Sequence, residues 1–232
     1  MHDPRVDQLA RQLVRYSTQV KKGDVVWIDC FDVPNYVAVA LIRAVSEAKA
    51  HPIVRLYDSA ISRELMIHAT EKQQDLVAEN SLELMKKTDC YIAVRGSYNI
   101  TENSDVPAAQ MQLVQSKMRP FMNERVNNTR WCVLRWPNGA MAQQAGMSTE
   151  AFENFFFKVC LLDYAALAPS MTALKKLMDK AKDVHIQGPG TDLRFSLKGL
   201  KAIPCGGRHN IPDGEVFSAP VRDSVEGVVS YN

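Results

Sequence analysis

The sequence lacks the features that define several large classes of protein. Its five cysteines are scattered with no C-x-x-C pair, which argues against a disulfide framework or a zinc finger. We interpret all five as structural. No apolar run reaches the length needed to cross a bilayer. The 28 basic and 26 acidic residues are interleaved, so nothing favours nucleic acid or an acidic membrane as a partner. We expect a cytoplasmic protein that binds neither.

Nucleotide-binding fingerprints are also missing. No G-x-G-x-x-G follows the first predicted strand, and G-x-x-x-x-G-K-[ST] occurs nowhere. Asp29 and Asp32 flank the end of that strand, which is the edge where open α/β sheets bind ligands. Without either fingerprint, we interpret these two aspartates as helix-capping or solvated loop residues.

The first part of the chain alternates apolar runs with amphipathic stretches. Buried-type strands are predicted at residues 25–30, 53–57, 90–94 and 131–136, and helical periodicity covers 5–20, 34–48, 61–87 and 104–125. Strand, helix and strand in succession form a βαβ unit with parallel strands. The predicted fold class is therefore α/β, with an open, doubly wound, mostly parallel sheet flanked by helices.

After Asp183 the pattern changes to short β runs separated by tight turns. We expect the start of a second, more β-rich domain, and divide the chain into residues 1–168, the α/β domain, and residues 169–232, the beginning of the second domain. The chain ends at Asn232 within or just after a predicted strand, which would leave an unpaired sheet edge. We therefore expect the second domain to be incomplete and the chain to be truncated.

A carboxylate follows a tight turn near the end of the chain. In the stretch Pro212-Asp213-Gly214-Glu215, proline fixes φ and glycine accepts the positive φ that other residues resist. The turn would deliver Glu215 to the start of a strand, where its carboxylate can be held rigidly. Spacing alone leaves two interpretations open, an exposed carboxylate on a strand edge and a metal ligand.

Several stretches resemble one enzyme family. The run Asn-Ile-Pro-Asp-Gly-Glu-Val-Phe-Ser-Ala-Pro at 210–220, followed by Asp-Ser-Val-Glu-Gly-Val-Val at 223–229, resembles the signature of the thermophilic-type metalloaminopeptidases, such as aminopeptidases T and S. Upstream, Gly188–Leu193 agrees, as do Trp136–Asn138 and Ala142–Ser148. The alternation of predicted strands and helices in the first half of the chain is the one expected of the first domain of that family.

The resemblance implies a hydrolase that removes N-terminal residues from peptides with a pair of divalent metals (Zn, Co, Mn or Mg), as a homodimer. It assigns Glu215 the role of a metal ligand and implies that residues 169–232 are the beginning of the metal-binding catalytic domain. The remaining ligands and the catalytic residues are expected beyond residue 232. One carboxylate cannot hold an ion against water, so these residues alone are expected to bind metal weakly or not at all and to lack activity.

Four other side chains are candidates near such a centre: Asp213, Glu226, His209 and His185. We interpret Asp213 as the residue that shapes the turn and His209 as a solvated loop histidine. Two alternative functions stay open, a non-catalytic binding or assembly protein on the same scaffold and an iron-dependent ring-cleaving dioxygenase related to the family.

Overall fold

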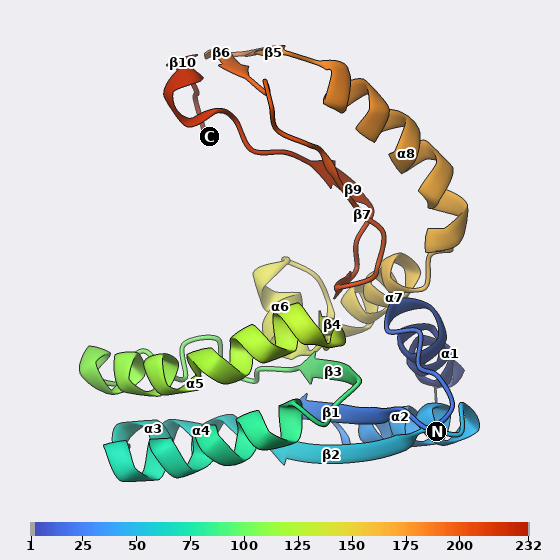
Figure 1. Cartoon of the computed structure of the whole chain (residues 1–232), viewed down its shortest axis with the longest axis vertical. Coiled ribbons are helices and arrows are strands. Elements are labelled where there is room, and N and C mark those ends of the chain that lie inside the picture. The colour runs from blue at the N-terminus through green and yellow to red at the C-terminus, as the bar shows by residue number, and fades with distance from the viewer. Residues whose placement is uncertain (1–2, 232) are drawn as a thin grey trace. The chain divides into compact units, whose positions relative to one another are not determined.

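The computed structural model describes residues 3–231, which form two compact units (Figure 1). Unit 1 comprises the chain up to Leu162 together with Arg208–Pro212, and unit 2 comprises Asp163–Gly207 and the residues from Asp213 onward. We describe each unit by itself. The predicted assignment of residues 169–232 to a catalytic domain stays a prediction.

Unit 1 is built on a five-stranded sheet with the order β2-β1-β3-β4-β8, in which every pairing is parallel. The strands are β1 (Val25–Phe31), β2 (His51–Tyr57), β3 (Cys90–Arg95), β4 (Arg130–Arg135) and β8 (Asn210–Ile211). The strand order reverses at β1, which is the mark of a doubly wound sheet. The predicted fold class is confirmed, and the structure adds the two-residue strand β8.

Seven α-helices flank the sheet: α1 (Pro4–Gln12), α2 (Asn35–Glu47), α3 (Ser59–Ile67), α4 (Glu71–Met85), α5 (Ala108–Asn128), α6 (Gly139–Gln144) and α7 (Thr149–Cys160), with a π-helical turn, η1 (Leu13–Ser17), after α1. Most begin at a residue whose side-chain oxygen accepts a backbone N–H of the first turn, as at Asp3, Asp58 and Ser148. Helices α4 and α5 run side by side (Figure 1).

Each face of the sheet has its own apolar core. On one face, Trp27 and Tyr91 pack with Met85 at the end of α4 and Phe121 of α5. On the other face, side chains of β3 and β4 meet those of α1, η1 and α2. Because both faces of the sheet are buried, the sequences of these strands are continuous apolar runs.

Asp29 lies inside this core, and its interpretation as a capping or solvated residue is wrong. Its side chain is only 3% exposed. One carboxylate oxygen accepts the Trp27 indole N–H at 2.6 Å, and the other accepts the Tyr91 hydroxyl at 2.7 Å. Burial raises the pKa of Asp29 in spite of these two hydrogen bonds. Asp32, in contrast, does cap a helix, because it accepts the backbone N–H of Ser59 at the start of α3.

Unit 2 contains one helix and short antiparallel strands. Helix α8 spans Tyr164–Lys180, and η2 (Arg222–Ser224) is a 3₁₀ turn. A three-stranded sheet with the order β10-β6-β5 consists of β5 (Asp183–Gly188), β6 (Thr191–Ser196) and β10 (Glu226–Val228). Strand β7 (Ile203–Cys205) pairs with β9 (Glu215–Phe217). The predicted change to short β runs after Asp183 is confirmed. The expectation about Asn232 lies outside the described residues.

Over residues 3–231, no single helix has both the length and the apolar composition of a membrane span. Helices α7 and α8 reach that length and apolar composition only when they are counted together as one interrupted span.

Replacing Asp29 should test the buried network. The Asp29→Ala variant leaves the Trp27 N–H and the Tyr91 hydroxyl without their acceptor, so the free energy of unfolding should fall by about 3 kcal/mol. Urea unfolding followed by tryptophan fluorescence measures it, and all three tryptophans lie in unit 1. The matched control is Asp105→Ala, which removes an exposed ion pair with Arg63 and should leave the midpoint close to that of the wild type. Equal midpoints for the two variants would contradict the role assigned to Asp29.

Candidate metal site

Glu215 and Cys205 are directly opposed in the antiparallel pair of β7 and β9. Opposed residues in such a pair project from the same face, with their Cβ atoms about 5 Å apart. The strand register therefore brings together two side chains that are separated by nine residues of intervening chain. A hydrogen bond of 3.0 Å from the Gly214 N–H to the Cys205 carbonyl closes the intervening loop at its base.

Asp213 fixes the turn that leads into β9. Its carboxylate accepts the N–H of Gly207 at 2.8 Å with one oxygen and the N–H of Gly214 at 3.0 Å with the other. Its own N–H donates to the hydroxyl of the buried Tyr164 at 3.1 Å. The predicted turn-shaping role of Asp213 is confirmed. Gly207 is required here, because its φ is +74° and a Cβ would lie 3.0 Å from the Tyr164 ring.

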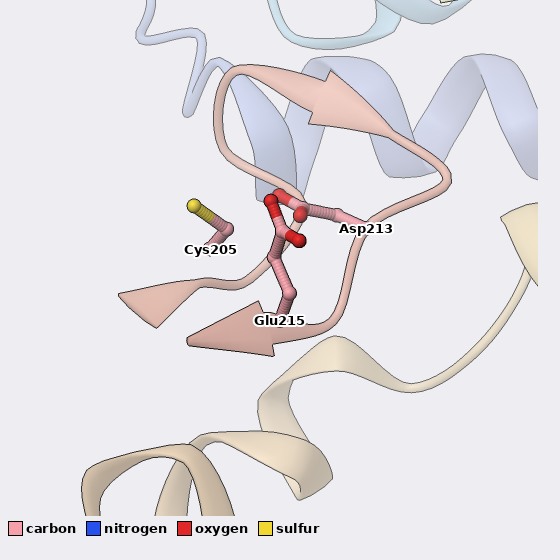
Figure 2. Close-up of side chains that lie close together, drawn as sticks. All are labelled: Cys205, Asp213 and Glu215. Carbon is pink, nitrogen blue, oxygen red and sulfur yellow. The ribbon is translucent and has the colours of Figure 1, made fainter. Parts of the chain in front are cut away.

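The three side chains Cys205, Asp213 and Glu215 form one cluster, which we call the hairpin cluster. The sulfur and one oxygen from each carboxylate lie within 4.8 Å of one another. Figure 2 shows the two carboxylates side by side, with the Cys205 sulfur set apart to one side of them. Glu215 is exposed, and the other two are half-buried. Burial, together with the negative charges of Asp213 and Glu215, raises the pKa of the Cys205 thiol. The same charges attract a cation.

The donors of the hairpin cluster fit a divalent metal. Zinc takes thiolate at about 2.3 Å and carboxylate oxygen at about 2.0 Å, so two such ligands on one ion lie about 3.5 Å apart. The donors would have to close by about 1 Å, which changes of rotamer at the exposed Glu215 and the half-buried Cys205 can supply. The Asp213 oxygens each accept one N–H and keep a further lone pair for an ion.

The other three candidate residues have different surroundings. His185 of β5 lies 2.8 Å from the Asp192 carboxylate, and this hydrogen bond lowers the pKa of Asp192. Glu226 is exposed on β10, opposite Arg194. His209 is exposed in unit 1, where its ring centroid lies 4.6 Å from that of Trp131. Among the residues that the structure describes, none of the three belongs to the hairpin cluster.

Cys205 is the member of the cluster that the sequence analysis missed. The other four cysteines are fully buried, in agreement with a structural role, but Cys205 is not. The local sequence carries a signal of the form C-x₇-D-x-E. That spacing becomes a ligand set only when the hairpin register places positions 205 and 215 opposite each other.

The carboxyl edge of the sheet in unit 1 holds a separate hollow of about 450 Å³. Asp32 and Asp58 line it, with Tyr57, Tyr98 and several aliphatic side chains. Its lining, as far as the structure describes it, includes no basic residue. This environment disfavours a phosphate group.

Comparison with known protein families shows to which family the chain belongs. Residues 2–232 match the family described as Thermophilic metalloprotease (M29). The chain belongs to this family. The M29 match extends over both units and includes the whole hairpin cluster. Among curated proteins, none matches the chain significantly.

Two solved structures share the fold of this M29 chain. AmpT from Thermus thermophilus superimposes with a TM-score of 0.77 at 22% sequence identity, over 97% of this chain and 64% of AmpT. The 2,5-dihydroxypyridine dioxygenase from Pseudomonas putida KT2440 gives a TM-score of 0.55 at 12% identity, over 98% of this chain and 59% of the dioxygenase. This chain therefore spans less than two thirds of either protein.

Removing the Asp213 carboxylate should loosen the turn. In Asp213→Ala, the Gly207 amide loses its acceptor, and its hydrogen exchange should accelerate by about tenfold. The Gly214 amide keeps the Cys205 carbonyl as an acceptor, so its exchange should accelerate less. Asp213→Asn keeps one carbonyl oxygen and should give an intermediate result. Amide exchange followed by NMR measures both variants. Glu226→Ala, an exposed change in the same unit, serves as the control. Unchanged exchange at both glycines in Asp213→Ala would show that the carboxylate does not hold the turn.

Proposed function

We propose that this chain is part of a metal-dependent aminopeptidase, in which Glu215 is a ligand of a two-metal centre. The observation that carries the proposal is the hairpin cluster, in which Glu215 leaves a hydrogen-bonded turn beside two further metal-binding side chains. Membership of a metalloprotease family supports it. Zn, Co, Mn and Mg are the candidate ions.

The chemistry of the proposal divides between the metals and the chain. Bound divalent ions lower the pKa of a water molecule and polarise the carbonyl of the peptide bond to be cleaved. Glu215 supplies an anionic oxygen donor from a strand, and Asp213 fixes the turn that positions this donor. Because Glu215 is exposed, its carboxylate remains accessible to an ion and to further ligands.

The proposal extends to the behaviour of residues 1–232 by themselves. A two-metal centre needs about five or six protein ligands around its ions. The hairpin cluster offers three, so we propose that metal binding by these residues is weak and that peptide hydrolysis needs ligands from outside them. The substrates are peptides with a free N-terminus. The resemblance further implies a homodimer in the cytoplasm, which light scattering and cell fractionation test.

The alternative functions have less support. The similarity to the dioxygenase concerns the fold alone, at a lower TM-score than that of AmpT. A non-catalytic assembly protein on this scaffold would have no need for three metal-binding side chains in one cluster. The non-catalytic alternative predicts that metal binding does not depend on Glu215.

Metal titration tests the role of Glu215. In isothermal titration with Zn²⁺, Co²⁺ or Mn²⁺, the wild-type chain should bind with a dissociation constant weaker than micromolar, because the hairpin cluster is partly exposed to competing water. Glu215→Gln keeps the shape and removes the charge, so its binding should fall below detection. Glu226→Gln removes one exposed carboxylate elsewhere in unit 2 and should bind as the wild type does.

Two results would count against the proposal. Equal affinities of the wild type and Glu215→Gln would remove Glu215 from the site. Submicromolar binding that needs Glu215 would refute the weak affinity proposed for these residues alone. Hydrolysis of aminoacyl-nitroanilides should be absent with residues 1–232 alone and should appear when the missing ligands are supplied in trans.

A further inference from the structure

Cys205 differs from the other cysteines of the chain in a way that its sequence context does not explain. Cys30, Cys90, Cys132 and Cys160 are buried, three of them in the parallel strands or their core, whereas Cys205 is half-buried beside two carboxylates. A thiol with a purely structural role gains nothing from this position, because neighbouring negative charges add no packing. The same position is favourable for a metal ligand.

We propose that Cys205 is a thiolate ligand of the ion held by Glu215 and Asp213, so that the hairpin cluster selects thiophilic ions such as Zn²⁺, Co²⁺ and Cd²⁺ over Mg²⁺ and Mn²⁺. This inference rests on the proposed role of Glu215 as a metal ligand and extends it by naming a third ligand and the class of metal.

The strand register provides the geometric support. Cys205 and Glu215 are opposed across the ladder, and the Gly214-to-Cys205 backbone hydrogen bond keeps this register closed. Asp213 is locked to two backbone amides. The Asp213 carboxylate is therefore held in place, whereas the Cys205 and Glu215 side chains, whose backbones are fixed by the register, turn toward the ion. Because the backbone of all three residues is already in place, only the two side-chain rotamers lose conformational entropy when the ion binds.

The donor chemistry decides which ions fit. Sulfur is a soft ligand that suits zinc and related ions, whereas magnesium and manganese prefer oxygen donors and water. One sulfur with two carboxylate oxygens is a composition that zinc accepts, with a fourth position left for water or a further ligand. The two carboxylates supply the negative charge that a divalent ion requires.

Binding must displace the thiol proton. When the bond between sulfur and metal forms, the Cys205 proton passes to solvent, and one water molecule leaves the hydrated ion. No oxidant or reductant takes part. The negative charges of Asp213 and Glu215 that oppose a free thiolate are offset once the cation is present.

Cobalt spectroscopy on the full chain tests the proposal. At saturating Co²⁺, the wild type should show a near-ultraviolet charge-transfer band from thiolate to metal, together with visible d–d bands. In Cys205→Ser the charge-transfer band should vanish, while the d–d bands persist if Asp213 and Glu215 still hold the ion. Zn²⁺ affinity should fall at least about tenfold in this variant, because removal of a direct ligand costs no less than removal of an outer-shell partner. Mg²⁺ affinity should be unchanged.

Alkylation provides a readout on the unmodified chain. Iodoacetamide should label Cys205 in preference to the four buried cysteines, and mass spectrometry locates the adduct. Zn²⁺ should protect Cys205 in the wild type and in Glu226→Gln but not in Glu215→Gln. Cys132, which is fully buried, is the internal control for unfolding.

The outcomes separate this inference from the proposed function. Co²⁺ binding that depends on Glu215 but gives no charge-transfer band would overturn the role of Cys205 and leave Glu215 as a ligand. Absence of any binding that depends on Glu215 would overturn both. A charge-transfer band of equal strength in Glu215→Gln would show that the two side chains do not share an ion.

Discussion

The candidate site depends on one feature of the backbone, the register of the two-stranded ladder between β7 and β9. In this register Cys205 faces Glu215. A shift by one residue would turn one of the two side chains to the opposite face of the ladder, because side chains alternate along a strand. The hydrogen bond between Gly214 and Cys205 opposes such a shift. The arrangement of the candidate ligands therefore depends on main-chain pairing as much as on the identity of the residues.

The turn before β9 connects this register to the sequence motif. Pro212 and Gly214 supply the backbone angles, and Asp213 supplies the acceptor that ties the turn to Gly207. Gly207 has no side chain, so the ring of Tyr164 can approach its backbone, and the Tyr164 hydroxyl in turn accepts the Asp213 N–H. The requirements of the turn, rather than a preference for a metal, thus explain why proline, aspartate and glycine follow one another here.

The sequence predicted the fold class but not the surroundings of Asp29 and Cys205, and the metal-ligand role predicted for Glu215 stays a prediction. Strand and helix periodicity depends on nearby residues, and it is read directly from apolar spacing. Asp29 becomes a core residue through Tyr91, which is 62 positions away on the next strand. Cys205 becomes a candidate ligand through Glu215, its partner across a hairpin. Both depend on strand pairing, and pairing is what a single sequence specifies least well.

The hairpin cluster combines fixed and movable donors. Asp213 is bound to two amides and is constrained, whereas Glu215 is exposed and keeps its side-chain freedom. A fully rigid set of three would impose its geometry on any ion, and a fully mobile set would lose most of its affinity to conformational entropy. One movable carboxylate, together with rotation of the Cys205 side chain, lets the site adjust its donor distances by about 1 Å while the strands stay in place. It also leaves that carboxylate free to reorient when a second ion or further ligands approach, which is what a shared metal centre requires.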